Sequence, residues 1–223
     1  ISEGEIIGCL DIQHISPNHF DENVIRTLQI IANQLSSALA KAELFARNQK
    51  LMEELSLLQA VATTAAEAQD EDDLVTRITD IMHKAFRADS IGFRLLNADL
   101  GVLQDHSSYI YRNKITAFMR TNPGEGIAGY VLNTGKAKNI ADVTQEPSFL
   151  GDPEVRSNLC VPIKIQDHVI GVINAESIKI AAFSENEMRL LITIAGYIAT
   201  AMEKIRLFAN AQDQAAEKAA LLA

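Results

Sequence analysis

The sequence predicts an α+β fold in which an antiparallel sheet is flanked by helices, and two observations support this prediction. Segments with the apolar pattern of strands are grouped between segments with the three-and-four spacing of helices, in the order helix, strands, helices, strands, helix. The dipeptide Asp167–His168 is expected to form a tight hairpin connection between the last two strands, which would therefore run antiparallel.

The first predicted element is a long helix over residues 24–66. Its apolar residues recur in alternating steps of three and four, slip near residues 48–50 and then resume, which indicates a coiled-coil seam with a stutter. At about 1.5 Å of rise per residue such a helix would be roughly 65 Å long, so one small domain cannot bury its apolar stripe. We expect a partner helix, most simply from a second copy of the chain in a homodimer.

The remaining elements follow in chain order. The acidic residues 70–73 complement the positive N-terminal dipole of a helix predicted over residues 72–86. Ser184, with Glu187 three residues later, forms the capping box of a last helix, whose apolar stripe extends to Phe208. Between these helices the pattern predicts strands over 90–96, 102–111, 138–141, 159–165 and 169–177, a short helix over 114–120 and a helix over 126–134.

The chain contains an internal repeat. Residues 5–49 align with residues 168–212 without a gap, and 16 of the 45 positions are identical. An offset of 163 residues is too long for a solenoid repeat, so each unit is expected to be a whole domain with its connector. Because the chain also begins at Ile1 without a methionine, we expect the end of one domain followed by a complete second domain.

Composition argues against several classes of function. The net charge of −9 does not suit a nucleic-acid-binding protein, which needs a basic surface. Cys9 and Cys160 have neither metal nor redox spacing, and this usage is typical of a reducing cytoplasm. The longest nearly apolar stretch, residues 190–202, has 13 residues and is too short to span a bilayer. We therefore expect a cytoplasmic chain without membrane insertion in this region.

Four motifs occur in a specific order along the second unit. They are the glycine-rich run at 124–135, the segment 139–149 around Asp142, the strand pair within 156–173, and the helix start at 183–191. Together they resemble the GAF domain family over about residues 68–208, and residues 4–45 repeat the last portion. The resemblance implies a six-stranded antiparallel sheet with helices on one face and a small-molecule pocket on the other.

The resemblance also implies a domain organisation and a signalling role. Residues 1–44 would be the C-terminal part of a first GAF domain, 45–67 a signalling linker helix, 68–203 a complete GAF domain, and 204–223 an exit coiled-coil helix. Such domains dimerise through flanking helices and signal to an output domain, for example a histidine kinase of a two-component system or a nucleotide cyclase. Ligand binding would shift the sheet against the last helix.

The residues leave a second class of function open, namely a thiol redox switch or thiol-dependent reductase centred on Cys160. Family members that reduce free methionine sulfoxide use several clustered cysteines, whereas each unit here has one, at non-equivalent positions. The cysteine of bilin-binding members is commonly followed by histidine, and here Val161 follows. The cyclic-nucleotide signature ends in Asp-Glu, and here that position reads Glu187–Met188.

Catalytic and cofactor motifs do not emerge from the sequence. The glycine run fits G-x-G-x-x-G, but a polar helix and Pro123 precede it instead of the strand that a dinucleotide site needs. No catalytic triad or P-loop occurs, and the histidines form no ligand set shared by both units. We therefore expect no catalytic residue, no cofactor and no metal.

Strand parity and the family's geometry give the candidate ligand-binding residues. Apolar and aromatic side chains would line the pocket wall, and a few polar groups would orient an unidentified small molecule. A plainer alternative is a structural spacer whose pocket is filled by its own side chains. The candidates are Phe93, Tyr109, Tyr111, Phe118, Ile127, Asp142, Asn158 and Cys160, with Leu95 as a further wall residue.

Overall fold

The computed structural model describes residues 6–112 and 120–221 and divides into two compact units, Ile1–Ser56 and Leu57–Ala223. The first unit consists of a segment without regular structure followed by most of helix α1, Glu22–Glu67. This helix has the extent that its heptad pattern predicts. The second unit contains the last turns of α1 and every strand of the sheet.

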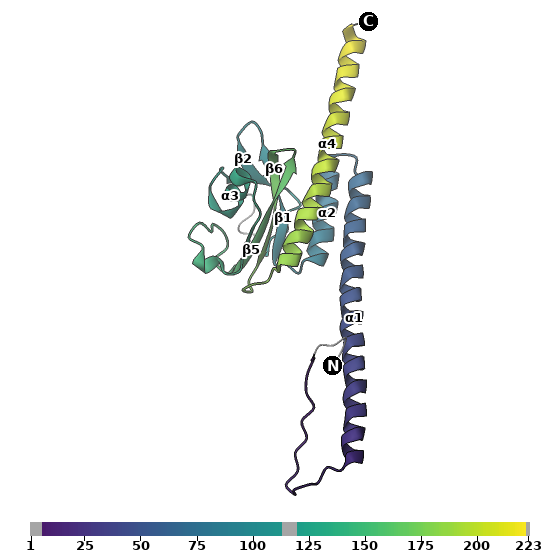
Figure 1. Cartoon of the computed structure of the whole chain (residues 1–223). Helices are drawn as coiled ribbons and strands as arrows, with labels where there is room; N and C mark the ends of the chain where they lie inside the picture. The colour runs from purple at the N-terminus through teal and green to yellow at the C-terminus, as the bar shows by residue number, and fades with distance from the viewer. Residues whose placement is uncertain (1–5, 113–119, 222–223) are drawn as a thin grey trace. The chain divides into compact units, whose positions relative to one another are not determined.

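The second unit is built on one six-stranded sheet with the strand order β3-β2-β1-β6-β5-β4 (Figure 1). All neighbouring strands pair antiparallel, so the predicted α+β fold with a six-stranded antiparallel sheet is confirmed. The strands are β1 Ser90–Asn97, β2 Val102–Asp105, β3 Arg120–Thr121, β4 Lys138–Ile140, β5 Ser157–Ile165 and β6 His168–Ser177.

Two helices cover one face of this sheet (Figure 1). They are α2, Glu71–Ala85, and α4, Glu185–Leu221, and Val61 from the last turns of α1 joins the same apolar cluster. Because their apolar residues recur every three or four positions, each helix presents one continuous stripe to the strands. The largest fully buried side chains of this cluster include Leu74, Ile78 and Met82 from α2 and Leu191, Ile194 and Ile198 from α4.

Helix α3, Gly126–Thr134, lies on the other face of the sheet (Figure 1). Its Ile127, Ala128 and Val131 form a second, smaller apolar cluster with residues of β2, β5 and β6. The glycines before and within α3 permit a sharp turn into the helix, since Gly124 has φ 81° and Gly126 φ 62°. The turn interpretation of the glycine-rich run is therefore confirmed.

The helix ends follow the local sequence signals. Ser184 and Glu187 form the predicted capping box, in which the Ser184 amide donates to the Glu187 carboxylate at 2.7 Å and the Glu187 amide donates to Ser184 Oγ at 3.3 Å. Asp70 caps α2 by accepting from the Asp73 amide at 2.8 Å. No helix among the described residues is long and apolar enough to cross a membrane.

The segment after β2 departs from the prediction of one strand over 102–111. The ladder ends at Asp105, the chain turns at Ser107–Ser108, and Ile110 then forms an isolated bridge with Ile91. A turn at two serines interrupts the strand because it redirects the backbone, so the prediction was too long by six residues. Of the predicted helix over 114–120, residues 114–119 lie outside the described residues, and Arg120 begins β3.

Candidate functional site

The face of the sheet beneath α3 carries a set of buried polar side chains. The register of β1, β6 and β5 fixes which residues lie side by side, because directly opposite residues of antiparallel strands point to the same face. Two neighbouring rows result: Ser90, Glu176 and Asn158 in the first, and Gly92, Asn174 and Cys160 in the second.

A chain of amide hydrogen bonds links these rows. Asn174 Nδ2 donates to Glu176 Oε1 at 3.0 Å and to the Tyr109 hydroxyl at 2.8 Å. Asn174 Oδ1 accepts from Asn158 Nδ2 at 2.9 Å. Asn158 and Asn174 are both 2% exposed, so each bond lies in the interior. We call Asn158, Asn174 and Glu176 the amide–carboxylate relay.

A buried ion pair lies on the same face. Arg94 Nε is 2.8 Å from Asp105 Oδ1, and the two side chains are only 7% and 1% exposed. The Arg94 guanidinium also lies 5.6 Å from the centroid of the Tyr109 ring. Tyr109 stacks on Tyr111 with ring centroids 4.4 Å apart, and the Tyr111 hydroxyl donates to Asp105. These contacts fix the position of Tyr109 above the relay.

Burial perturbs the protonation of this cluster. It raises the pKa of the Glu176 carboxyl, against the opposing effects of Arg94 and the hydrogen bond from Asn174. It also raises the pKa of the Cys160 thiol to about 12 and places the pKa of Tyr109 well above its usual value. Burial alone would lower the pKa of Arg94. The electrostatic effect of neighbouring acidic groups, to which Tyr109 contributes most, outweighs burial and raises this pKa. Arg94 is therefore the one permanently charged cation of the buried set.

A cavity of about 30 Å³ opens onto these side chains. This volume holds about two to three water molecules, since a water needs about 10–15 Å³ on the same measure. The first turn of α3 covers one side of it and the loop after η2, Val143–Gln145, covers another. Among the described residues its polar lining includes Arg94, Asn158, Asn174 and Glu176, and its apolar lining includes Ile127, Phe149 and Leu150.

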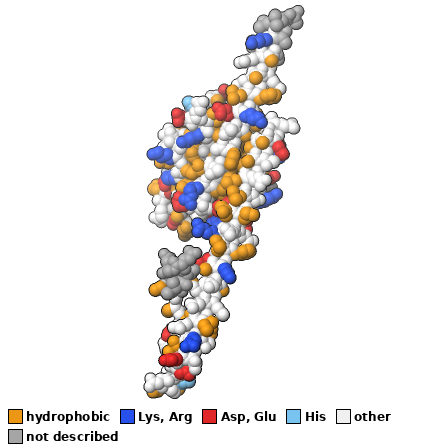
Figure 2. Space-filling model, turned by 45° about the vertical axis from the view of Figure 1, so that its right-hand side comes forward, with side chains coloured by type: hydrophobic (Ala, Val, Ile, Leu, Met, Phe, Trp, Pro, Cys, Tyr) orange, Lys and Arg blue, Asp and Glu red, His pale blue; other side chains and the backbone are white. Residues whose placement is uncertain are grey.

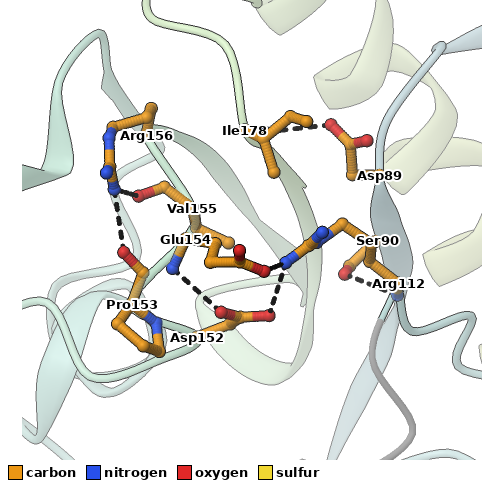
Figure 3. Close-up of polar contacts among 9 residues, drawn as sticks. All are labelled: Asp89, Ser90, Arg112, Asp152, Pro153, Glu154, Val155, Arg156 and Ile178. Atoms are coloured by element: carbon orange, nitrogen blue, oxygen red, sulfur yellow. Dashed lines mark hydrogen bonds and ion pairs between the residues drawn. The ribbon is translucent and has the colours of Figure 1, made fainter.

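The loop that precedes β5 is held by ionic contacts shown in Figure 3. Arg112 forms ion pairs with Asp152, at 3.4 Å, and with Glu154. Arg156 donates to the carbonyl oxygens of Pro153 and Val155 at 2.8 and 3.0 Å. These bonds fasten the loop that leads from Phe149 and Leu150 into β5.

The structure brings together some of the predicted site residues. Asn158 and Ile127 line the cavity. Tyr109 and Tyr111 lie in the polar cluster on the same face. Cys160 is on this face as well, but it is fully buried in the apolar cluster with Val131 and is absent from the described cavity lining.

Three predicted residues lie elsewhere. Phe93 and Leu95 pack in the cluster with α2 and α4, so the expectation that Phe93 lines the pocket is wrong. The physical reason is parity: successive residues of a strand point to opposite faces, and it is Gly92 and Arg94 that face α3. Asp142 caps η2 by accepting from the Thr144 amide at 3.0 Å and does not line the cavity. Phe118 lies outside the described residues.

Sequence reasoning missed four polar residues of the site: Arg94, Asp105, Asn174 and Glu176. A signal was present in the strands themselves. Asn174 and Glu176 are two residues apart in a largely apolar strand, and Arg94 follows Gly92 by the same spacing. Polar residues at period two within buried strands indicate one polar face.

The described residues contain no group of three or more histidine, cysteine, aspartate or glutamate side chains that could hold a metal ion. The arrangement lacks a nucleophile next to a base, because the Cys160 thiol is buried and its pKa is raised. What the arrangement offers is a pre-formed set of hydrogen-bonding groups in an enclosure that is partly polar and partly apolar, which suits binding.

The sheet thus carries α2 and α4 on one face and, on the other, a polar cavity covered by α3. The chain belongs to the GAF domain family, which it matches over residues 68–203. This range agrees with the segment in which the four motifs occur, and the GAF fold is consistent with a regulatory sensor module.

Similar proteins differ in activity. The chain is 28% identical over 199 residues to the dual 3',5'-cyclic-AMP and -GMP phosphodiesterase 11A of Takifugu rubripes. The aligned region covers 77% of this chain and 22% of that protein. It therefore spans about a fifth of the length of this relative.

Solved structures show the same fold at low identity. The free methionine-R-sulfoxide reductase from Neisseria meningitidis in complex with its substrate has a TM-score of 0.61 and 21% identity, covering 69% of this chain and 90% of that one. The GAF domain of the Acinetobacter phosphoenolpyruvate-protein phosphotransferase has a TM-score of 0.62 and 17% identity, covering 69% and 94%. Because an enzyme and a domain of a phosphotransferase share the fold, the fold alone does not separate catalysis from regulation.

Proposed function

We propose that this chain is a non-catalytic regulatory module that binds a small molecule beneath α3 and transmits the signal through its helices to an output domain elsewhere in the protein. The observation that carries the proposal is the buried polar set around the cavity. Arg94, Asn158, Asn174 and Glu176 are each at most 8% exposed, and burying such groups is costly. A ligand-binding role explains why they are placed next to a cavity.

The sheet offers a direct route for the signal. In β6, Asn174 and Glu176 face the cavity, whereas Ile173 and Ala175 between and beside them pack in the helix-covered cluster. A displacement of β6 by a ligand therefore moves side chains of the apolar cluster to which α4 also contributes. Since packed interfaces shift between discrete arrangements, such a displacement favours a rotation or register change of the helix.

The test is to purify the chain under native conditions and search for a bound small molecule by native mass spectrometry, together with a thermal-shift screen of metabolites. We expect at least one compound to stabilise the chain, and Asn158→Ala to remove its effect. Asn210→Ala, on the exposed surface of α4, is the matched control and should leave the effect unchanged. If no compound in the screen gives a stabilisation that Asn158→Ala removes, ligand binding at this cavity is refuted.

We further propose that the helices form a homodimer through the heptad stripe of α1. In the single chain this stripe is exposed: Leu35 is 50% exposed, Phe45 69% and Met52 69%. Figure 2 shows apolar side chains at the surface along the helices. Apolar residues at heptad spacing are buried most simply by the same stripe of a second copy.

Light scattering after size-exclusion chromatography tests the dimer. The wild-type chain is expected at twice its monomer mass of 24.4 kDa, and Leu35→Glu should shift it toward the monomer. Arg47→Glu, another charged substitution on the exposed surface of α1, is the control. A wild-type chain that is monomeric at micromolar concentration would contradict the proposal.

The first unit supports the proposal that residues 1–44 end a first GAF domain, with a linker helix over 45–67, the complete domain over 68–203 and an exit helix over 204–223. An apolar groove of about 440 Å³ is lined by Leu10, Ile12, Phe20, Ile25 and Leu28, among others. With the 163-residue offset, four of these five correspond to residues buried in the helix-covered cluster of the second unit: Ile173, Ala175, Phe183 and Leu191.

Limited proteolysis tests this domain assignment. We expect trypsin to cut in residues 6–56 well before it cuts within residues 68–203, and mass spectrometry of the fragments locates the sites. Equal protection of both regions would contradict the assignment. The cysteine usage supports a cytoplasmic location, and the net charge of −9 argues against nucleic acid as a partner.

The second candidate function is a thiol switch or reductase centred on Cys160. It is favoured only by the position of the thiol on the cavity face of β5. Burial of the thiol, whose pKa is raised to about 12, opposes it because the thiolate is the reactive form. A Cys160→Ser variant with unchanged ligand response and unchanged reactivity toward peroxide would eliminate this candidate, and a loss of peroxide reactivity would favour it.

A further inference from the structure

The relay beneath α3 specifies the chemistry of its ligand. We propose that the ligand presents a small cationic N–H donor group, of the amidinium or ammonium class, to Asn158 Oδ1 and the Glu176 carboxylate. This inference rests on the proposed function, because it concerns the ligand of the same cavity.

The hydrogen bonds within the relay determine which acceptor atom remains available at the cavity. The Glu176 carboxylate has only acceptor atoms when ionised, so the side chain of Asn174 must offer its NH₂ group to it. The Asn174 oxygen then needs a donor and takes it from Asn158 Nδ2. As a result Asn158 Oδ1 is left as an acceptor, and among the described residues it has no hydrogen-bond partner.

This oxygen is the kind of group that a ligand satisfies. Asn158 is 2% exposed and lines the cavity. A buried acceptor without a partner is costly, and native structures pair nearly all such groups. Glu176 is its direct cross-strand neighbour in the β5–β6 ladder, so the two acceptors lie next to each other. Two adjacent acceptors match a group with several N–H donors.

The charge balance favours a cation. Arg94 is paired with Asp105, and Asp152, the other carboxylate that acts on Glu176, is paired with Arg112. Glu176 is therefore the buried carboxylate of the cavity lining whose charge no ion pair among the described residues balances. Arg120 and Glu125 also line the cavity, but both are exposed and their charges are opposite in sign, so the buried Glu176 decides the preference. An incoming cation pairs with Glu176, whereas an anion would place a second negative charge beside it. The small volume of the cavity admits the charged group itself and not a bulky substituent.

The internal repeat carries a related pair. Asp11 and Gln13 of the first unit correspond to Asn174 and Glu176, so the acid and the amide are both present with their positions exchanged. Gln13 Nε2 donates to Asp11 Oδ2 at 2.9 Å, but both side chains are exposed in a segment without regular structure. The correspondence with the buried pair is therefore one of residue type.

Three planar compounds of equal size test the charge preference: acetamidinium, acetamide and acetate. Binding of each to the full chain is measured by saturation-transfer NMR and by thermal shift at constant ionic strength. We expect acetamidinium to bind at least tenfold more tightly than acetamide, and acetate more weakly than both. Glu176→Gln should weaken acetamidinium at least tenfold, while Glu185→Gln, an exposed control on α4, should not.

The outcomes separate this inference from the proposed function. Preferred binding of acetamide or acetate overturns the cationic class but leaves a ligand cavity in place. Acetamidinium binding that survives Glu176→Gln overturns the assignment to the relay. If none of the three binds, the inference is overturned. The proposed function is then decided separately by the metabolite screen, in which the wild-type chain is compared with Asn158→Ala. Circular dichroism and urea unfolding of each variant confirm that it is folded.

Discussion

Gly92 lies in the middle of β1, directly beneath the side chain of Tyr109, and Gly92→Ala therefore tests the packing that supports the cavity. A Cβ atom placed on Gly92 would be 2.7 Å from Cγ and Cδ2 of the Tyr109 ring and 2.8 Å from the Cα atom of Tyr109. Carbon atoms in favourable contact are about 3.5–4.0 Å apart, so the new methyl group is about 1 Å too close. Because one of the clashing atoms is backbone, a change of side-chain rotamer does not relieve the contact.

The expected cost follows from two contributions. Overpacking a well-packed interior costs about 1–3 kcal/mol. Displacement of Tyr109 also breaks its hydrogen bond with Asn174, which contributes about 1 kcal/mol. The sum of about 2–4 kcal/mol corresponds to a decrease in Tm of roughly 4–16 °C for a chain of this size.

Urea unfolding followed by circular dichroism and by tyrosine fluorescence measures this cost, since the chain has four tyrosines and no tryptophan. Gly196→Ala is the matched control: its Cβ would meet nothing within 4 Å, so the substitution should stabilise α4 by about 0.5–1 kcal/mol. A Gly92→Ala variant within about 0.5 kcal/mol of the wild type would refute the close approach of Tyr109.

The remaining predictions concern the thiols, one carboxyl and one cap. In the folded chain at pH 8, iodoacetamide should modify the exposed Cys9 and spare the buried Cys160, as mass spectrometry of peptides will show. Burial raises the pKa of Glu176 above its unfolded value, so the folded state binds the extra proton and its stability falls as pH rises through that pKa. Glu176→Gln should remove this dependence and raise the Tm at neutral pH, and an unchanged pH profile would contradict it. Ser184→Ala should lower the free energy of unfolding by about 1 kcal/mol through loss of the α4 cap, measured by urea unfolding.

Much of the scaffold is readable from the sequence because it depends on local pattern. The heptads of α1, the capping box at Ser184 and the glycine turn at Gly124 each involve residues within a few positions of one another. The face of Asn158 in β5 was also predictable, because β5 adjoins a recognisable motif and its parity is anchored there.

The parity of β1 is readable from its alternation, since Ile91, Phe93 and Leu95 share one face and Ser90, Gly92 and Arg94 share the other. Its first five residues are all buried, so the pattern does not say which of the two faces carries the cavity. Choosing the aromatic residue as the pocket wall therefore placed Phe93 on the wrong face. The turn at Ser107–Ser108 had a similar effect, since it placed Tyr109 by tertiary contact and not by continuation of β2.

The sequence by itself determined the α+β class, the repeated unit and the ends of the helices, because neighbouring residues set these through periodicity, capping and backbone freedom. Only the tertiary structure decided the site. Arg94 meets Asp105 across the β1–β2 ladder, and Glu176, Asn174 and Asn158 become one relay only through the register of β5 with β6. Register depends on the packing of whole faces against α2, α3 and α4, and this packing brings polar residues that are far apart in the sequence into one buried, hydrogen-bonded set.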